Sequence, residues 1–282
     1  MINLLRVLLK KYTPNLYNKS QPIRNFIFKS FFTKKSELNV LKEFSEYAPN
    51  VSGDIDKKIE TTVYNIKNFS KSLLDLSSSN REIKKFNTLG DKDKRELGDL
   101  FFKYGSDKKT HEYDFLYKYI IEKLGKIDLL IEVGIGSNNI DVLSNMSEHG
   151  KPGASLRAFR DYLNESKIVG LEYDKSVLFF EDRIETYFYD QHSEGSINEI
   201  SKKYYKQADI LIDDGLHSII ANINTIKLAK NILKPNGYLI IEDIGFDSLN
   251  LFNVAFEFIT NDFSLELFTN DSCYAACLRR LK

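Results

Sequence analysis

Residues 211–218, LIDDGLHS, place two adjacent carboxylates at the end of an apolar run. Neighbouring carboxylates repel each other, and removing both from water is costly. A bound divalent cation would remove this conflict, and oxygen ligands favour a hard ion such as Mg²⁺, Ca²⁺ or Mn²⁺. Asp213 and Asp214 are therefore candidate members of a cation site.

A second acidic pair, Glu242 and Asp243, ends the run GYLIIED at residues 237–243. If both runs are neighbouring strands of a parallel sheet, their ends lie about 5 Å apart. Asp214 and Asp243 could then ligate one ion, which makes Asp214 both a ligand and a candidate catalytic residue. Asp213 either shares in this ligation or points back toward a cofactor.

His217 follows Asp214 by three residues and is expected at the start of the next helix, facing the same rim. Histidine exchanges protons near neutral pH, so beside a cation it could act as the base that deprotonates a hydroxyl group. The alternative is a helix-start histidine with a structural hydrogen bond. The nearby second acidic pair favours the base.

The elements that would position these residues follow from the apolar pattern after about residue 97. Continuous apolar runs alternate with segments of helical spacing, here 155–163 and 218–233, which predicts a mainly parallel sheet with helices on both faces, a doubly wound α/β domain. Ligands of such sheets bind at the carboxyl ends of the strands. The predicted strands are residues 128–133, 167–173, 185–190, 208–213, 237–243 and 273–278.

Acidic residues end five of these strands, and glycines follow the first one. Gly134 and Gly136 permit the close backbone approach that a ligand over a turn requires, although a tight turn alone also explains them. Glu172, at the end of the second strand, could accept both hydroxyls of a ribose or could simply be solvated. Together they suggest an adenosine-type ligand. The acidic strand ends are Glu132, Glu172, Asp190, Asp213 with Asp214, and Glu242 with Asp243.

Composition sets limits on the class of protein. Lys and Arg total 40, as do Asp and Glu, so the 282-residue chain has no general attraction for nucleic acid. Residues 1–36 contain basic residues and no acid, which indicates either a solvated arm or contact with an anionic membrane face. No signal peptide or apolar run of about 18 residues is present, and Cys273 and Cys277 are expected to be reduced core residues. We therefore expect a cytoplasmic protein, with the inner membrane face as the alternative.

Several of these stretches resemble class I S-adenosylmethionine-dependent methyltransferases, and among them the metal-dependent O-methyltransferases of macrolide sugars and bacterial surface glycans. The resemblance covers about residues 100–282. The matching stretches, in chain order, are YGSDKKTHEY (104–113), EVGIG (132–136), SNMSEHGKPGASLRAFRDYL (144–163), GLEYD (170–174), YDQ (189–191), IDDGLHS (212–218) and LKPNGYLIIEDI (233–244).

This resemblance implies a seven-stranded sheet whose last strand is antiparallel, in a domain over residues 96–282. Residues 1–95 lie outside the resemblance, and their pattern predicts a helical extension before that domain. It implies that YGSDK and His111 belong to a segment that closes over the cofactor and substrate. It implies S-adenosylmethionine and a divalent ion, expected to be Mg²⁺, as cofactors. The implied cofactor residues are Glu132, Gly134 and Gly136 at the methionine end, Ser155 and Arg157 in a covering segment, Glu172 at the ribose, and Asp190 and Gln191 near the adenine.

The implied reaction moves a methyl group to a hydroxyl of a sugar or glycan, free, nucleotide-linked or lipid-linked, with Asp214 and Asp243 holding the ion and His217 as base. A metal-dependent glycosyltransferase is the alternative, since it too uses an acidic pair. An NAD-dependent dehydrogenase is disfavoured because the third glycine of its fingerprint is missing. A non-catalytic scaffold leaves the retained acidic pairs unexplained. A homo-oligomer is compatible with the sequence.

Overall fold

The computed structural model describes residues 82–282, except positions 92, 143, 147–149, 246–248, 250–251, 253–255 and 257–258. The basic residues 1–36 and most of the expected extension over residues 1–95 lie outside the described residues. Membrane contact and the division of the chain at residue 96 therefore stay predictions.

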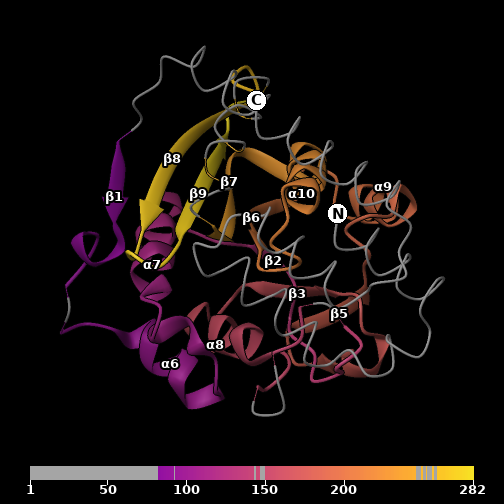
Figure 1. Cartoon of the computed structure of the whole chain (residues 1–282), viewed down its shortest axis with the longest axis horizontal. Coiled ribbons are helices and arrows are strands. Elements are labelled where there is room, and N and C mark those ends of the chain that lie inside the picture. Colours follow the sequence, from indigo (N-terminus) through magenta and orange to yellow (C-terminus); the bar gives the residue numbers. More distant parts are fainter. Residues whose placement is uncertain are drawn as a thin grey trace, which may run out of the picture. The chain divides into compact units, whose positions relative to one another are not determined.

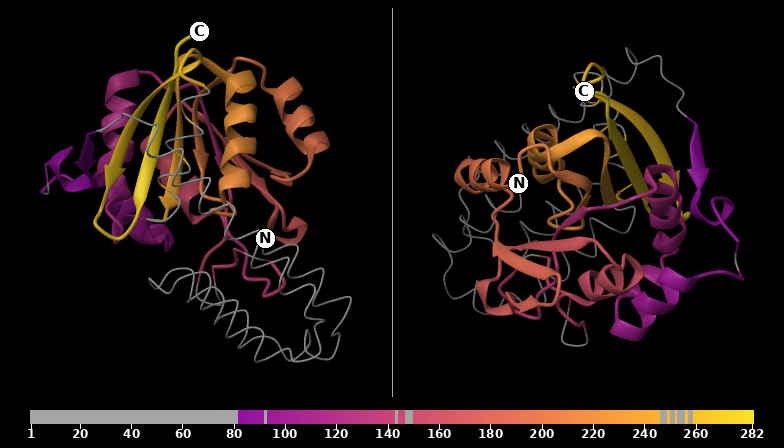
Figure 2. Two further views of the ribbon diagram at one scale, coloured as in Figure 1. Left: turned by 45° about the horizontal axis from the view of Figure 1, so that its top comes forward. Right: turned by 180° about the vertical axis from the view of Figure 1, so that it is seen from behind.

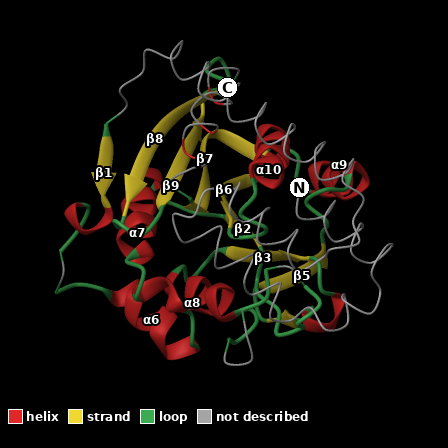
Figure 3. Cartoon of the chain, in the orientation of Figure 1, coloured by secondary structure: helices red, strands yellow, loops and turns green. Residues whose placement is uncertain are grey.

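Helices and strands alternate through the described residues (Figure 3). The strands are β1 (Ile83–Lys85), β2 (Leu129–Val133), β3 (Lys167–Glu172), β4 (Phe180–Glu181), β5 (Ile184–Phe188), β6 (Ala208–Asp213), β7 (Leu233–Ile244), β8 (Phe263–Thr269) and β9 (Tyr274–Arg280). The α-helices are α6 (Glu96–Tyr104), α7 (Tyr113–Leu124), α8 (Ala154–Tyr162), α9 (Glu194–Lys203) and α10 (Ile219–Ile232), and the short 3₁₀ helices are η1 (Phe86–Thr88), η2 (Asp107–Lys109) and η3 (Lys175–Val177).

The strands form one sheet in the order β1-β8-β9-β7-β6-β2-β3-β5-β4 (Figure 1). Strands β7, β6, β2, β3 and β5 are mutually parallel, and β9 runs antiparallel to β7 and to β8. This confirms the doubly wound α/β fold and the antiparallel last strand. The seven expected strands lie at the centre, and the edge strands β1 and β4 bring the total among the described residues to nine.

Alternation along each strand divides the core into two layers. Leu129, Ile131 and Val133 of β2 belong to one buried cluster, and Leu130 belongs to the other. The first cluster includes residues of α9 and α10, and the second includes residues of α6, α7 and α8. Figure 2 shows the purple helices α6 and α7 and the orange helices α9 and α10 on opposite sides of the sheet. Since successive side chains alternate, Glu132 faces the same side as Leu130.

Within the part of the chain that the structure describes, no helix combines the length and the apolar character that crossing a membrane requires. Cys277 is buried, as expected of a core residue, whereas Cys273 is only partly buried; both are free thiols in the structure.

Candidate active site

The candidate site lies where β2, β6 and β7 end. Asp213 pairs in register with Ile241 of β7, and the backbone N–H of Asp214 donates to the carbonyl of Val133 at 2.9 Å. Asp214 therefore leaves the sheet next to the end of β2, while Glu242 and Asp243 follow Ile241 directly. Parallel register thus brings both predicted acidic pairs to one rim, as the sequence indicated.

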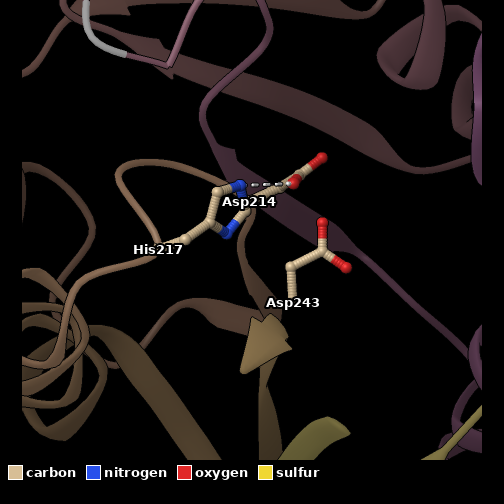
Figure 4. Close-up of side chains that lie close together, drawn as sticks. All are labelled: Asp214, His217 and Asp243. Atoms are coloured by element: carbon tan, nitrogen blue, oxygen red, sulfur yellow. Dashed lines mark ion pairs between the residues drawn. The ribbon is translucent and has the colours of Figure 1, made fainter. Parts of the chain in front are cut away.

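Asp214, His217 and Asp243 converge at this rim (Figure 4). One potential ligand atom from each lies within 4.8 Å of the others. His217 Nε2 lies 3.6 Å from Asp214 Oδ1. Helix α10 begins at Ile219 behind its cap Ser218, so His217 lies in the preceding loop, where its left-handed φ of 46° turns the chain.

Asp243 is held by two side chains that the sequence analysis gave no role. The Tyr113 hydroxyl donates to Asp243 Oδ1 at 2.8 Å and lies 2.9 Å from the Asp243 backbone N–H. The Cys273 thiol donates to the same oxygen at 3.2 Å. Burial acts to raise the pKa of Asp243, but the charge of His217 and these two hydrogen bonds outweigh it and hold that pKa below its usual value. Asp243 is therefore ionised and fixed in orientation.

Lys108 is the main residue that the sequence analysis missed. It is 4% exposed, and its Nζ lies 2.7 Å from Asp214 Oδ2, 2.7 Å from Glu242 Oε1 and 3.4 Å from Glu132 Oε1. The Tyr117 hydroxyl also donates to Glu242. Burial disfavours the ammonium ion, but Asp214, Glu242 and Glu132 together raise the pKa of Lys108 well above its usual value. The only sequence signal was its place in the YGSDK stretch.

Glu132 and Ser155, both predicted to bind cofactor, are brought together. Ser155 Oγ donates to Glu132 Oε2 at 2.6 Å, while Glu132 Oε1 is buried without a hydrogen-bond partner. Burial raises the pKa of Glu132 to about 7, against the attraction of Lys108. A buried acceptor at a strand end, beside the turn of Gly134 and Gly136, suits a cationic ligand group.

Glu172 ties the ends of β2 and β3 together. Its Oε2 accepts from the backbone N–H of Ile135 at 3.0 Å, and its Oε1 accepts from those of Tyr173 and Asp174. Gly134 has φ 84°, and a Cβ there would collide with the backbone oxygen of Asp214. Oε1 thus already accepts two hydrogen bonds and Oε2 accepts one, and ribose binding by Glu172 stays a prediction. Gly134 is required for backbone packing as well as for any ligand.

The remaining predicted cofactor residues already have protein partners. Asp213 is 1% exposed and accepts from Gln191 Nε2 at 2.8 Å and from Asn222 Nδ2 at 3.0 Å. Asp190 accepts from the backbone N–H of His192, and Arg157 donates to Glu181 and to the carbonyl of Pro152. Asp213 and Gln191 therefore form one buried network, whereas Arg157 does not join it. Their contacts with a cofactor stay predictions.

The two curated relatives that the chain matches are both named sugar O-methyltransferases. The chain is 28% identical over 152 residues to a tetracenomycin rhamnosyl 3'-O-methyltransferase of Streptomyces olivaceus, and 24% identical over 150 residues to a tetracenomycin rhamnosyl 2'-O-methyltransferase of the same organism. These matches cover 53% and 52% of this chain and 37% of each relative. No sequence profile of a known protein family matches the chain.

Among solved structures, the methyltransferase MycE of the mycinamycin biosynthetic pathway, in complex with Mg, SAH and mycinamycin VI, matches with a TM-score of 0.55 and 22% identity. The match covers 67% of this chain and 55% of MycE. A second MycE structure, with Mg and SAH, gives a TM-score of 0.54. The described part of this chain thus has the class I methyltransferase fold and is similar in sequence to sugar O-methyltransferases.

Proposed function

We propose that this chain transfers a methyl group from S-adenosylmethionine to a hydroxyl of a sugar-containing acceptor. The observation that carries the proposal is the convergence of Asp214, His217 and Asp243 at the carboxyl rim of a class I methyltransferase sheet. The named activities of the two rhamnosyl O-methyltransferases and the ligands named with MycE support it.

The donor set fits a hard divalent ion. One potential ligand atom from each of two carboxylates and an imidazole lies within 4.8 Å of the other two, close enough for one ion to contact all three. The ionised Asp243 is fixed in orientation by Tyr113 and Cys273. Asp214 and Asp243 would hold the ion, expected to be Mg²⁺. When bound, it lowers the pKa of an acceptor hydroxyl and orients it.

The protein's own groups account for the other parts of the reaction. His217 accepts the hydroxyl proton, and Asp214, 3.6 Å from its Nε2, stabilises the imidazolium that forms. Glu132, whose Oε1 has no hydrogen bond and lies 3.4 Å from Lys108 Nζ, would hold the ammonium of the methionine moiety. Glu172 would accept the ribose hydroxyls, and Asp190 and Gln191 would lie near the adenine. Methyl transfer needs few covalent contributions from the protein, so orientation supplies most of the acceleration.

The test has a binding arm and a turnover arm. Calorimetric titration of S-adenosylmethionine, with Mg²⁺ and then with a chelator, is expected to show binding. His217→Ala is expected to bind the cofactor normally and to lose roughly 10²–10⁴-fold in turnover on a panel of sugar-bearing acceptors that includes rhamnosides. The exposed His192, changed to Ala, is the matched control. Normal turnover in His217→Ala would remove His217 from the mechanism.

The alternative of a metal-dependent glycosyltransferase is not supported, because both sequence relatives are named O-methyltransferases and the similar solved structure of MycE contains SAH. A glycosyltransferase would bind a nucleotide sugar and not S-adenosylmethionine, so the same titration separates the two functions. The turn at Gly134 and Gly136 followed by Glu172 supports the adenosyl ligand.

We further propose that the extension predicted over residues 1–95, before the methyltransferase domain predicted over residues 96–282, contributes to acceptor choice; its described residues include β1, which pairs with β8 of the sheet. The basic residues 1–36 are proposed to contact the inner face of a membrane, in an otherwise cytoplasmic protein. Fractionation of cells that express the chain with and without residues 1–36 tests this contact, and an unchanged distribution would dismiss it.

A further inference from the structure

Two groups of potential cation ligands share one residue at the candidate site. One group is Asp214, His217 and Asp243, and the other is Glu132, Asp214 and Glu242. The two groups use different sides of Asp214, because Oδ1 lies nearest to His217 whereas Oδ2 faces Lys108. Among the described residues, the rim therefore offers two adjacent places for a cation.

The second group of acids already surrounds a cation of the protein itself, the Lys108 ammonium. Lys108 Nζ lies within 2.8 Å of both oxygens of Glu242 and 2.7 Å from Asp214 Oδ2. These acids come from the ends of β6 and β7, and Glu132, at 3.4 Å, comes from β2. The ammonium ion thus contacts acids from three strand ends, and among the described residues Glu132 and Glu242 form ion pairs with Lys108, while Asp214 also pairs with His217.

Lys108 is held in this position from outside. Arg95 donates to the backbone carbonyl of Lys109 at 2.6 Å and to Asp114, which anchors η2 to the start of α7. Asn270 Nδ2 donates to the carbonyl of His111 at 2.9 Å, which ties the same segment to the β8–β9 turn. Lys108 is therefore a fixed, buried group and not a surface chain that meets the acids by chance.

We propose that the Lys108 ammonium is a resident cation that competes with a divalent ion for Asp214 and Glu242. While Lys108 is present, the ion is directed to the side of Asp214 that faces His217 and Asp243. Lys108 is thus a positioning residue for the ion. The inference rests on the proposed function only for the role of that ion, since the contacts of Lys108 stand without it.

The test is titration of the full chain with Mn²⁺, followed by calorimetry and by the electron paramagnetic resonance signal of free Mn²⁺. Lys108→Met removes the charge and keeps the apolar stem. It is expected to bind one more Mn²⁺ than the wild type, or the same number at least tenfold more tightly. Lys108→Arg keeps the charge and should bind as the wild type does. An unchanged number with unchanged or weaker affinity in Lys108→Met would overturn the proposal.

A second variant covers the case in which Lys108→Met fails to fold. Lys108→Met combined with Glu132→Gln leaves the net charge of the cluster unchanged and still frees Asp214 and Glu242. A gain in Mn²⁺ binding is therefore expected here too, smaller than in Lys108→Met because one carboxylate of the group is lost. A wild type that binds no Mn²⁺, with a variant that binds one, would support the resident cation and count against the metal in the proposed function. One ion in the wild type and no gain in either variant would overturn this inference alone.

Discussion

Replacement of Asp213 by Asn should reveal whether this buried carboxylate serves the fold or the cofactor. Asp213 Oδ1 accepts from Gln191 Nε2 at 2.8 Å, and its Oδ2 accepts from Asn222 Nδ2 at 3.0 Å. An Asn side chain has one amide NH₂, which must face one of these two donors. One hydrogen bond is lost, and the other loses its charge.

The magnitude follows from the contacts. A hydrogen bond to a charged group contributes about 1.5–3 kcal/mol, and a buried donor left unpaired costs a further 1–3 kcal/mol or so. We expect Asp213→Asn to lose on the order of 3 kcal/mol in the free energy of unfolding. At roughly 2–4 °C per kcal/mol for a domain of this size, the melting temperature should fall by about 6–12 °C.

Urea denaturation and thermal melting measure this loss, with Asp182→Asn as the control. Asp182 has a side chain 89% exposed and one ion pair at 3.7 Å, so its change should stay within about 0.5 kcal/mol. A loss below about 1 kcal/mol in Asp213→Asn, with weakened S-adenosylmethionine binding, would refute the structural role and place the carboxylate at the cofactor.

Three further predictions concern the same rim. Tyr113→Phe should weaken Mn²⁺ binding about tenfold, because Asp243 loses its 2.8 Å hydrogen bond; unchanged calorimetric affinity would show that Tyr113 does not orient it. Gly134→Ala should lower the free energy of unfolding in urea more than Gly125→Ala does. Both glycines have positive φ, but a Cβ at Gly134 would collide with the backbone of Asp214, whereas a Cβ at Gly125 would have no atom within 4 Å. Burial raises the pKa of Glu132 to about 7 from 4.5, so its contribution to stability is present below pH 4.5 and is lost as the pH rises to 7. Glu132→Gln should therefore gain on the order of 3 kcal/mol relative to the wild type across that interval; a difference that stays constant with pH would contradict this.

The central strands were predictable because their signal is local. Apolar runs such as ADILID in β6 and GYLIIED in β7 lie buried on both faces, and their acidic ends meet once the strands pair in parallel. The register of two adjacent strands was therefore enough to bring Asp214 and Asp243 together.

Other parts depend on contacts that no local pattern encodes. Strand β8 alternates apolar and polar residues, unlike the continuous apolar runs from which the strands were predicted, and β1 and β4 are too short to give a pattern. Lys108 reaches Asp214 across 106 residues and Glu242 across 134, through the placement of η2 against the rim. Arg157 pairs with Glu181 of β4, a contact that its position in α8 could not reveal.

The backbone at the rim has a consequence for selection experiments. His217 and Asp243 both adopt left-handed φ values, 46° and 51°, which cost a residue with a side chain roughly 1–2 kcal/mol. Glycine at either position, which has no Cβ, would relieve that cost. A library selected only for thermal stability should therefore enrich such replacements and yield more stable proteins that have lost the site. A screen for thermostable variants must therefore measure turnover in the same round.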